Sequence, residues 1–92
     1  MKRKTFVIKS KYGIHLRPAN RIYEVIKKYK SKVEVKKEDN VVDARSLLGM
    51  ITLNVLPGDK IEIIASGPDE DKVIEELTDL IENKNLGDSE DD

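Results

Sequence analysis

The sequence predicts an α+β fold in which an antiparallel β-sheet is covered by helices on one side. Three observations support this prediction. Four short stretches alternate apolar and polar residues, as half-buried strands do. Three other stretches carry helix-start residues or apolar residues at helical spacing, and the resulting order is βαββαβα. Because each strand is apolar on one face, the helices are expected to cover that face.

The first predicted elements are a strand and a helix. Residues 5–9 form the strand, with Phe6 and Ile8 on one face. A helix follows over about residues 17–30, because Pro18 suits a first helical turn, where its missing N–H costs nothing. The apolar residues of this helix recur at helical spacing: Ala19, Ile22, Ile26 and Tyr29.

A hairpin, a short helix and a fourth strand are predicted next. Residues 32–36 and 41–43 alternate like strands on either side of a polar turn, which is typical of a hairpin. Ser46 is a suitable N-cap for a short apolar helix that begins at Leu47. Residues 61–65 form the fourth predicted strand.

The last predicted element is an amphipathic helix that opens at residues 66–69. A stripe of apolar residues indicates its buried face: Val73, Ile74, Leu77, Leu80 and Ile81. Residues 87–92 are mostly acidic and are expected to form a disordered tail. The sequence thus predicts one domain over residues 1–86 and an acidic disordered tail over residues 87–92.

Composition excludes several classes of protein. The 92 residues include no cysteine, which excludes disulfides and thiolate metal sites. There is one histidine, no histidine–carboxylate cluster and no glycine-rich nucleotide loop, so neither a metal nor a cofactor is expected. No apolar run approaches the ~20 residues that cross a bilayer, and the basic start lacks the apolar stretch of a secretion signal. We therefore expect a soluble, cytoplasmic protein with no membrane insertion.

Charge is distributed unevenly along the chain. Residues 1–40 carry 13 Lys or Arg against 4 Asp or Glu, a net charge of +9. Residues 41–92 carry 4 against 14, a net charge of -10. This asymmetry predicts either a basic docking face or a fold in which both halves interleave and their charges cancel.

The single histidine, His15, lies between the first strand and the first helix. The first backbone N–H groups of a helix have no acceptor inside it, and the positive end of the helix dipole lies there, so helix starts recur as phosphate sites. Arg17 can add a charge-assisted hydrogen bond to phosphate oxygens, and Gly13 gives the loop a backbone geometry closed to other residues. Since a neutral imidazole is a nucleophile near pH 7, the segment has the parts of a phosphoryl acceptor. The alternative is an exposed loop histidine beside a chance arginine.

Ser46 is the second residue of interest. A helix cap alone explains a serine at this position, but a phosphate added there would also be tolerated electrostatically. The apolar residues that follow it could be core residues or part of a docking patch: Leu47, Leu48 and Met50.

Two segments at these residues resemble the HPr family, the histidine-containing phosphocarriers of the bacterial sugar phosphotransferase system. Residues 13–19 (GIHLRPA) resemble its phosphorylation site, and residues 46–50 (SLLGM) resemble its regulatory serine segment. The similarity covers about residues 2–86. It implies an open-faced β-sandwich, with a four-stranded antiparallel sheet and three helices on one face.

The resemblance also implies a function, that of a phosphoryl carrier rather than an enzyme. His15 would accept phosphate on Nδ1 from the phosphoenolpyruvate-dependent Enzyme I and pass it to the IIA domain of a sugar permease, while Arg17 steadies the phosphoryl group. Ser46 would be phosphorylated by the ATP-dependent HPr kinase/phosphorylase, which would slow transfer through His15 and create a binding site for a catabolite-control repressor. The chain is expected to act as a monomer.

Three positions beside the histidine, Tyr12, Leu16 and Asn20, differ from the small residues usual in the family. They motivate an alternative, a regulatory binding module that acts mainly through phosphorylated Ser46 with little carrier flux. The residues expected to bind partners are Leu16, Asn20, Arg21, Lys27, Leu47, Leu48 and Met50. A third hypothesis is a nucleic-acid binder that uses the basic patch at residues 27–30 and 36–37.

Overall fold

The computed structural model describes the backbone of residues 1–90 and the side chains of residues 1–87. The elements occur in the predicted order βαββαβα: β1 (Lys2–Val7), α1 (Leu16–Ile26), β2 (Lys32–Lys37), β3 (Asn40–Asp43), α2 (Leu47–Thr52), β4 (Lys60–Ser66) and α3 (Glu70–Thr78). The last helix continues as one wider π-helical turn, η1 (Asp79–Asn83), and a short 3-10 segment, η2 (Asn85–Glu90).

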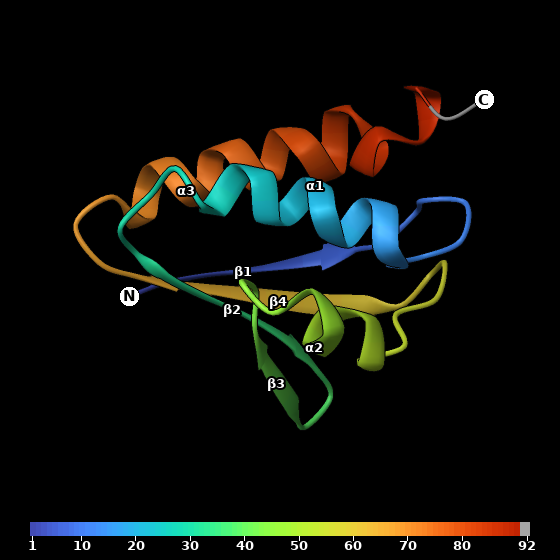
Figure 1. Ribbon diagram of the computed structural model, residues 1–92, viewed down its shortest axis with the longest axis horizontal. Helices are drawn as coiled ribbons and strands as arrows, with labels where there is room; N and C mark the ends of the chain where they lie inside the picture. The colour runs from blue at the N-terminus through green and yellow to red at the C-terminus, as the bar shows by residue number, and fades with distance from the viewer. Residues whose placement is uncertain (91–92) are drawn as a thin grey trace.

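The four strands form one antiparallel sheet in the order β1-β4-β2-β3. Its register places Phe6 opposite Ile61 and Val35 opposite Ile63, so apolar residues of neighbouring strands share a face. In Figure 1, α1 and α3 lie next to each other across this sheet, and they contact each other. The predicted open-faced α+β sandwich is therefore confirmed.

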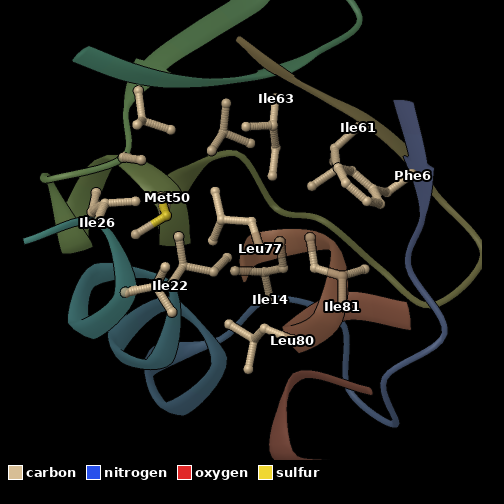
Figure 2. Close-up of a cluster of buried hydrophobic side chains, with 14 of the residues drawn as sticks. Phe6, Ile14, Ile22, Ile26, Met50, Ile61, Ile63, Leu77, Leu80 and Ile81 are labelled. Atoms are coloured by element: carbon tan, nitrogen blue, oxygen red, sulfur yellow. The ribbon is translucent and has the colours of Figure 1, made fainter. Parts of the chain in front are cut away.

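The core fills the space between the sheet and the helices. Figure 2 shows side chains of β1, β4, α1 and α2 meeting those of the last helix in one cluster. The cluster includes Leu80 and Ile81, as the predicted apolar stripe requires. It also includes Ile14, which is 4% exposed and immediately precedes the histidine. Burial of Ile14 thus ties the functional segment to the core.

Two element boundaries differ from the predicted ones. Strand β1 begins at Lys2 rather than at residue 5, because Lys2 already pairs with Ala65 of β4. Helix α1 ends at Ile26 rather than near residue 30. Beyond it the hydrogen bonds tighten to i→i−3, with Tyr29 N–H donating to Ile26 O at 3.0 Å. The chain thus turns toward β2 earlier than apolar spacing alone indicates.

One carboxylate, that of Asp69, fastens this turn to the start of α3. It accepts the backbone N–H groups of Lys30 and Ser31, each at 2.9 Å, and the hydroxyl of Ser31. The hydrogen bond from the Ser31 side chain and then that from the Lys30 backbone lower the pKa of Asp69 below its usual value. The junction therefore holds the ionised form of Asp69.

The opposite charges of the two halves meet across the fold. Lys28 pairs with Glu76 at 2.5 Å, which joins the end of α1 to α3. Similar pairs connect early and late residues elsewhere: Lys2 with Asp71, Arg3 with Glu62, Lys4 with Glu82, and Lys37 with Asp59. These contacts support the interleaved arrangement, because they pair basic residues of the first half with acidic residues of the second half.

The expected acidic tail, residues 87–92, extends beyond the described residues, and its disorder stays a prediction. Gly87, at its start, is buried against the Arg21 side chain, where an added Cβ would lie 2.2 Å from Nε of Arg21. Leu86 before it is 1% exposed. The packed part of the chain therefore reaches at least residue 87.

A tight loop precedes α1 and directs the chain from the core to the surface. Gly13 has φ +72°, and an added Cβ would lie 1.9 Å from the carbonyl oxygen of Val55. The same oxygen accepts the N–H of Ile14 at 2.9 Å. The buried Ser10 closes the loop, because its hydroxyl donates to Gly13 O at 2.8 Å and its carbonyl accepts Gly13 N–H at 3.1 Å.

We predict that Gly13→Ala destabilises the fold by at least ~3 kcal/mol, since the new methyl group meets backbone that cannot yield. Gly58→Ala is the matched control. Gly58 also has a positive φ, +92°, but an added Cβ there meets nothing within 4 Å. It should cost only the ~1 kcal/mol of left-handed strain. Urea unfolding measures both, and equal losses for the two variants would contradict the steric argument.

We also predict a stability contribution from Asp69 that depends on pH. Because folding lowers the pKa of Asp69, its contribution is present above the unfolded pKa, about 4, and is lost as the pH falls through the lower folded pKa. Asp69→Asn should therefore be less stable than the parent at pH 7, with the difference shrinking toward pH 2. Asp71→Asn, which changes an exposed ion pair with Lys2, is the control and should change stability little. A difference independent of pH would refute the assignment.

Candidate functional site

His15 stands at the boundary between the tight loop and α1. It is the N-cap residue of α1, with φ -104° and ψ -163°, and its side chain makes no capping hydrogen bond. The imidazole is half-exposed, although Ile14 on one side and Pro18 on the other are buried. The imidazole is therefore accessible to solvent, while the buried residues on either side hold its backbone in place.

The start of α1 lies at this histidine, as predicted. Helical hydrogen bonding begins when Ala19 N–H donates to His15 O at 3.0 Å. The N–H groups of a first helical turn have no acceptor within the helix, and the helix dipole adds partial positive charge there. No acidic residue occupies this turn. An anion attached to the ring would therefore meet favourable charge.

Arg17 and two neighbours complete the surface around the ring. A shallow hollow is lined by His15, Leu16, Arg17 and Asn20, so the structure brings these predicted site residues together. Arg17 is exposed, and Leu16 is 61% exposed. A guanidinium beside a nucleophilic nitrogen can neutralise the oxygens of a phosphoryl group during transfer. The hollow is open enough for another protein's residue to reach the ring.

The loop supplies contacts that sequence reasoning missed. The ring of Tyr12 packs against the imidazole of His15 with centroids 5.9 Å apart and planes at 73°. Ser10 and Val55 support the same loop from below through the hydrogen bonds already described. The glycine pattern indicated a turn, but nothing in the sequence indicated that Val55 would be its acceptor.

Ser46 also lies where the sequence predicts, at the N-cap of α2. Its hydroxyl oxygen accepts the N–H of Gly49 at 3.0 Å, and the residue is exposed. Leu48 in the first turn is 72% exposed, while Leu47 is half-buried. The expected contact of Met50 with partners is wrong: its side chain is 1% exposed and packs in the core, because its place in the helical period faces the core.

The basic residues of α1 are less available than the sequence indicated. Lys27 pairs with Glu24 at 2.6 Å, and the hydrogen bond that its ammonium donates to this carboxylate raises the pKa of Lys27. Arg21 is half-buried and packs against Gly87. In the patch suggested for nucleic acid, the hydroxyl of Tyr29 donates to Glu76 and Lys37 is only 17% exposed. These contacts argue against a nucleic-acid surface.

Two other kinds of site, a metal centre and a membrane-spanning helix, are not found in the described residues. Over residues 1–87, where side chains are described, no group of three histidine, cysteine or acidic residues is placed to hold a metal ion. Within the described backbone, no helix combines the length and apolar character needed to span a membrane.

Comparisons with known proteins agree with this geometry. Residues 2–83 match the family described as "PTS HPr component phosphorylation site". The chain is 35% identical over 83 residues to the phosphocarrier protein HPr of Borreliella burgdorferi. The matched region covers 90% of this chain and 96% of that protein. It is 34% identical to a segment of the multiphosphoryl transfer protein of Haemophilus influenzae, of whose length it spans 16%.

Solved structures show the same likeness. A crystal structure of HPr from Thermoanaerobacter tengcongensis superposes with a TM-score of 0.89 at 37% identity, covering 95% of this chain and 97% of the other. The family match includes the histidine loop, the start of α1 and the α2 segment. The chain therefore belongs to the HPr family of phosphocarrier proteins of the phosphotransferase system.

Proposed function

We propose that this chain relays a phosphoryl group from Enzyme I to the IIA domains of sugar permeases through His15. The observation that carries the proposal is the half-exposed imidazole at the N-cap of α1, with Arg17 beside it and no hydrogen bond to the helix. The carrier must accept the phosphoryl group from one partner and then give it to another. A histidine at the surface can take part in both transfers.

The chemistry needs few groups. The lone pair of His15 Nδ1 attacks phosphorus on the phosphohistidine of Enzyme I. A new N–P bond forms, the donor's N–P bond breaks, and its electron pair returns to the donor ring. The IIA histidine later attacks in the same way, and His15 recovers its electron pair. In-line transfer of this kind depends on positioning and charge neutralisation.

The surroundings of His15 suit a carrier more than a tight phosphate site. The helix start and Arg17 stabilise the added charge, but the open hollow leaves it partly solvated. Strong binding of the phosphorylated state would slow onward transfer. Leu16 on α1 and Leu48 on α2 are exposed apolar side chains, and the two helices contact each other. We propose that partners dock there and that the carrier acts as a monomer.

We further propose that Ser46 is a regulatory phosphorylation site, modified by the HPr kinase/phosphorylase, with a catabolite-control repressor as a partner of the phosphorylated form. Two features support this. The hydroxyl is exposed at a helix N-cap, where a phosphate would be stabilised by the first-turn N–H groups of α2. It also adjoins Leu48, so the added charge would fall within the proposed docking surface.

Phosphorylation of His15 is the first prediction from this proposal. Incubation with phosphoenolpyruvate and a general Enzyme I should add one acid-labile, base-stable phosphate per chain, seen by phosphorus NMR. His15→Ala should remove it fully, because no other histidine is present. Ser46→Ala should be loaded as the parent is. Absence of label on the parent protein would refute the carrier function.

The second prediction concerns charge at residue 46. Ser46→Asp should slow loading of His15 by Enzyme I about tenfold, which corresponds to ~1.4 kcal/mol, since it places a negative charge in the docking surface. Ser46→Asn is the matched control: asparagine caps a helix as aspartate does but carries no charge. It should load at the parent rate. If both variants slow transfer equally, capping geometry and not charge controls the site.

A further inference from the structure

The ring of Tyr12 is the immediate neighbour of the reacting imidazole. The two rings meet edge to face, with centroids 5.9 Å apart and planes at 73°, an arrangement that aromatic pairs favour. Within the described part of the chain, the His15 ring has this one aromatic contact, and it makes no capping hydrogen bond to α1. The orientation of the imidazole therefore depends on Tyr12.

The backbone places Tyr12 in this position. The left-handed turn at Gly13 reverses the chain, so residue 12 comes alongside residue 15. Reciprocal hydrogen bonds between Ser10 and Gly13 close the turn, and the Ile14–Val55 hydrogen bond fixes it to the segment before β4. Tyr12 thus projects from a loop with little freedom to move away from the imidazole.

A second contact holds the Tyr12 ring itself. The ammonium of Lys11 lies 5.5 Å from the ring centroid, within the range of a cation–π interaction. This contact matters because Tyr12 is 65% exposed and its outer side has no core packing to restrain it. The ammonium of Lys11 thus contacts the ring of Tyr12, and that ring in turn contacts the imidazole of His15.

We infer that Tyr12 is a positioning residue for phosphoryl transfer: its ring restricts the imidazole to orientations in which the accepting nitrogen faces an incoming phosphorus atom. The inference rests on the proposed function of His15 and adds the residue that orients it. An imidazole on a free side chain samples several rotamers, and only a fraction of them align the lone pair with the bond being broken. Restricting those rotamers raises the rate of the chemical step without changing partner affinity.

The test compares three variants in single-turnover loading by phosphorylated Enzyme I, with the carrier concentration varied. Tyr12→Leu removes the aromatic ring and keeps apolar bulk, whereas Tyr12→Phe keeps the ring and removes the hydroxyl. Val41→Ala, which trims another exposed apolar side chain on β3, is the control. Tyr12→Leu should lower the maximal rate about three- to tenfold, the effect of losing one aromatic pair, and leave half-saturation within about twofold. Tyr12→Phe and Val41→Ala should match the parent.

Proton NMR of the His15 ring gives a second readout that needs no partner. Tyr12→Leu should shift the Hδ2 and Hε1 resonances by removing the ring current, while Tyr12→Phe should keep them near the parent values. Loading of Tyr12→Leu at the parent rate, or a change confined to half-saturation, would overturn the inference. If the parent itself takes no phosphate, the proposed function fails, and the NMR comparison still decides whether Tyr12 orients His15.

Discussion

The site depends on one contrast between neighbours: Ile14 must be buried and His15 must reach the surface. The hydrogen bond from Ile14 N–H to Val55 O, at 2.9 Å, holds the chain at this point. The left-handed turn at Gly13 makes the bond possible, because any side chain there would collide with the same carbonyl oxygen. The histidine can be accessible and still well placed because its backbone belongs to the core.

The electrostatics of the site come mainly from the backbone. A helix start provides oriented N–H groups that are fixed before any phosphate arrives, so no reorganisation is needed when charge is added. Arg17 contributes a side-chain charge, from an exposed position in the hollow. Under the proposed function, this combination would stabilise the phosphoryl group only moderately, as a carrier requires. The second helix start, at Ser46, repeats the arrangement with a hydroxyl in place of an imidazole.

Long-range ion pairs determine how much of the surface stays basic. The chain carries strongly opposite charge in its two halves, but pairing of β1 with β4 and of α1 with α3 brings them together. Lys28 and Lys37 are engaged in this way by acidic residues 48 and 22 positions later in the sequence. The surface around His15 is mixed, because the hollow at the ring is lined by the apolar Leu16, the amide of Asn20 and the guanidinium of Arg17. Under the proposed function, recognition by partners would depend on shape and apolar contact as well as on charge.

Local sequence determined the strands, the helices and the two helix starts, because periodicity, Pro18 and the capping serine act over a few residues. It therefore placed His15 and Ser46 correctly on their elements. Only the tertiary structure decided that Met50 faces the core, that Val55 receives the histidine loop and that Tyr12 packs on the imidazole. Each of these depends on how a helix face or a loop is packed after folding. The spacing of hydrophobic residues indicates which residues are buried. It does not specify which neighbours those residues contact.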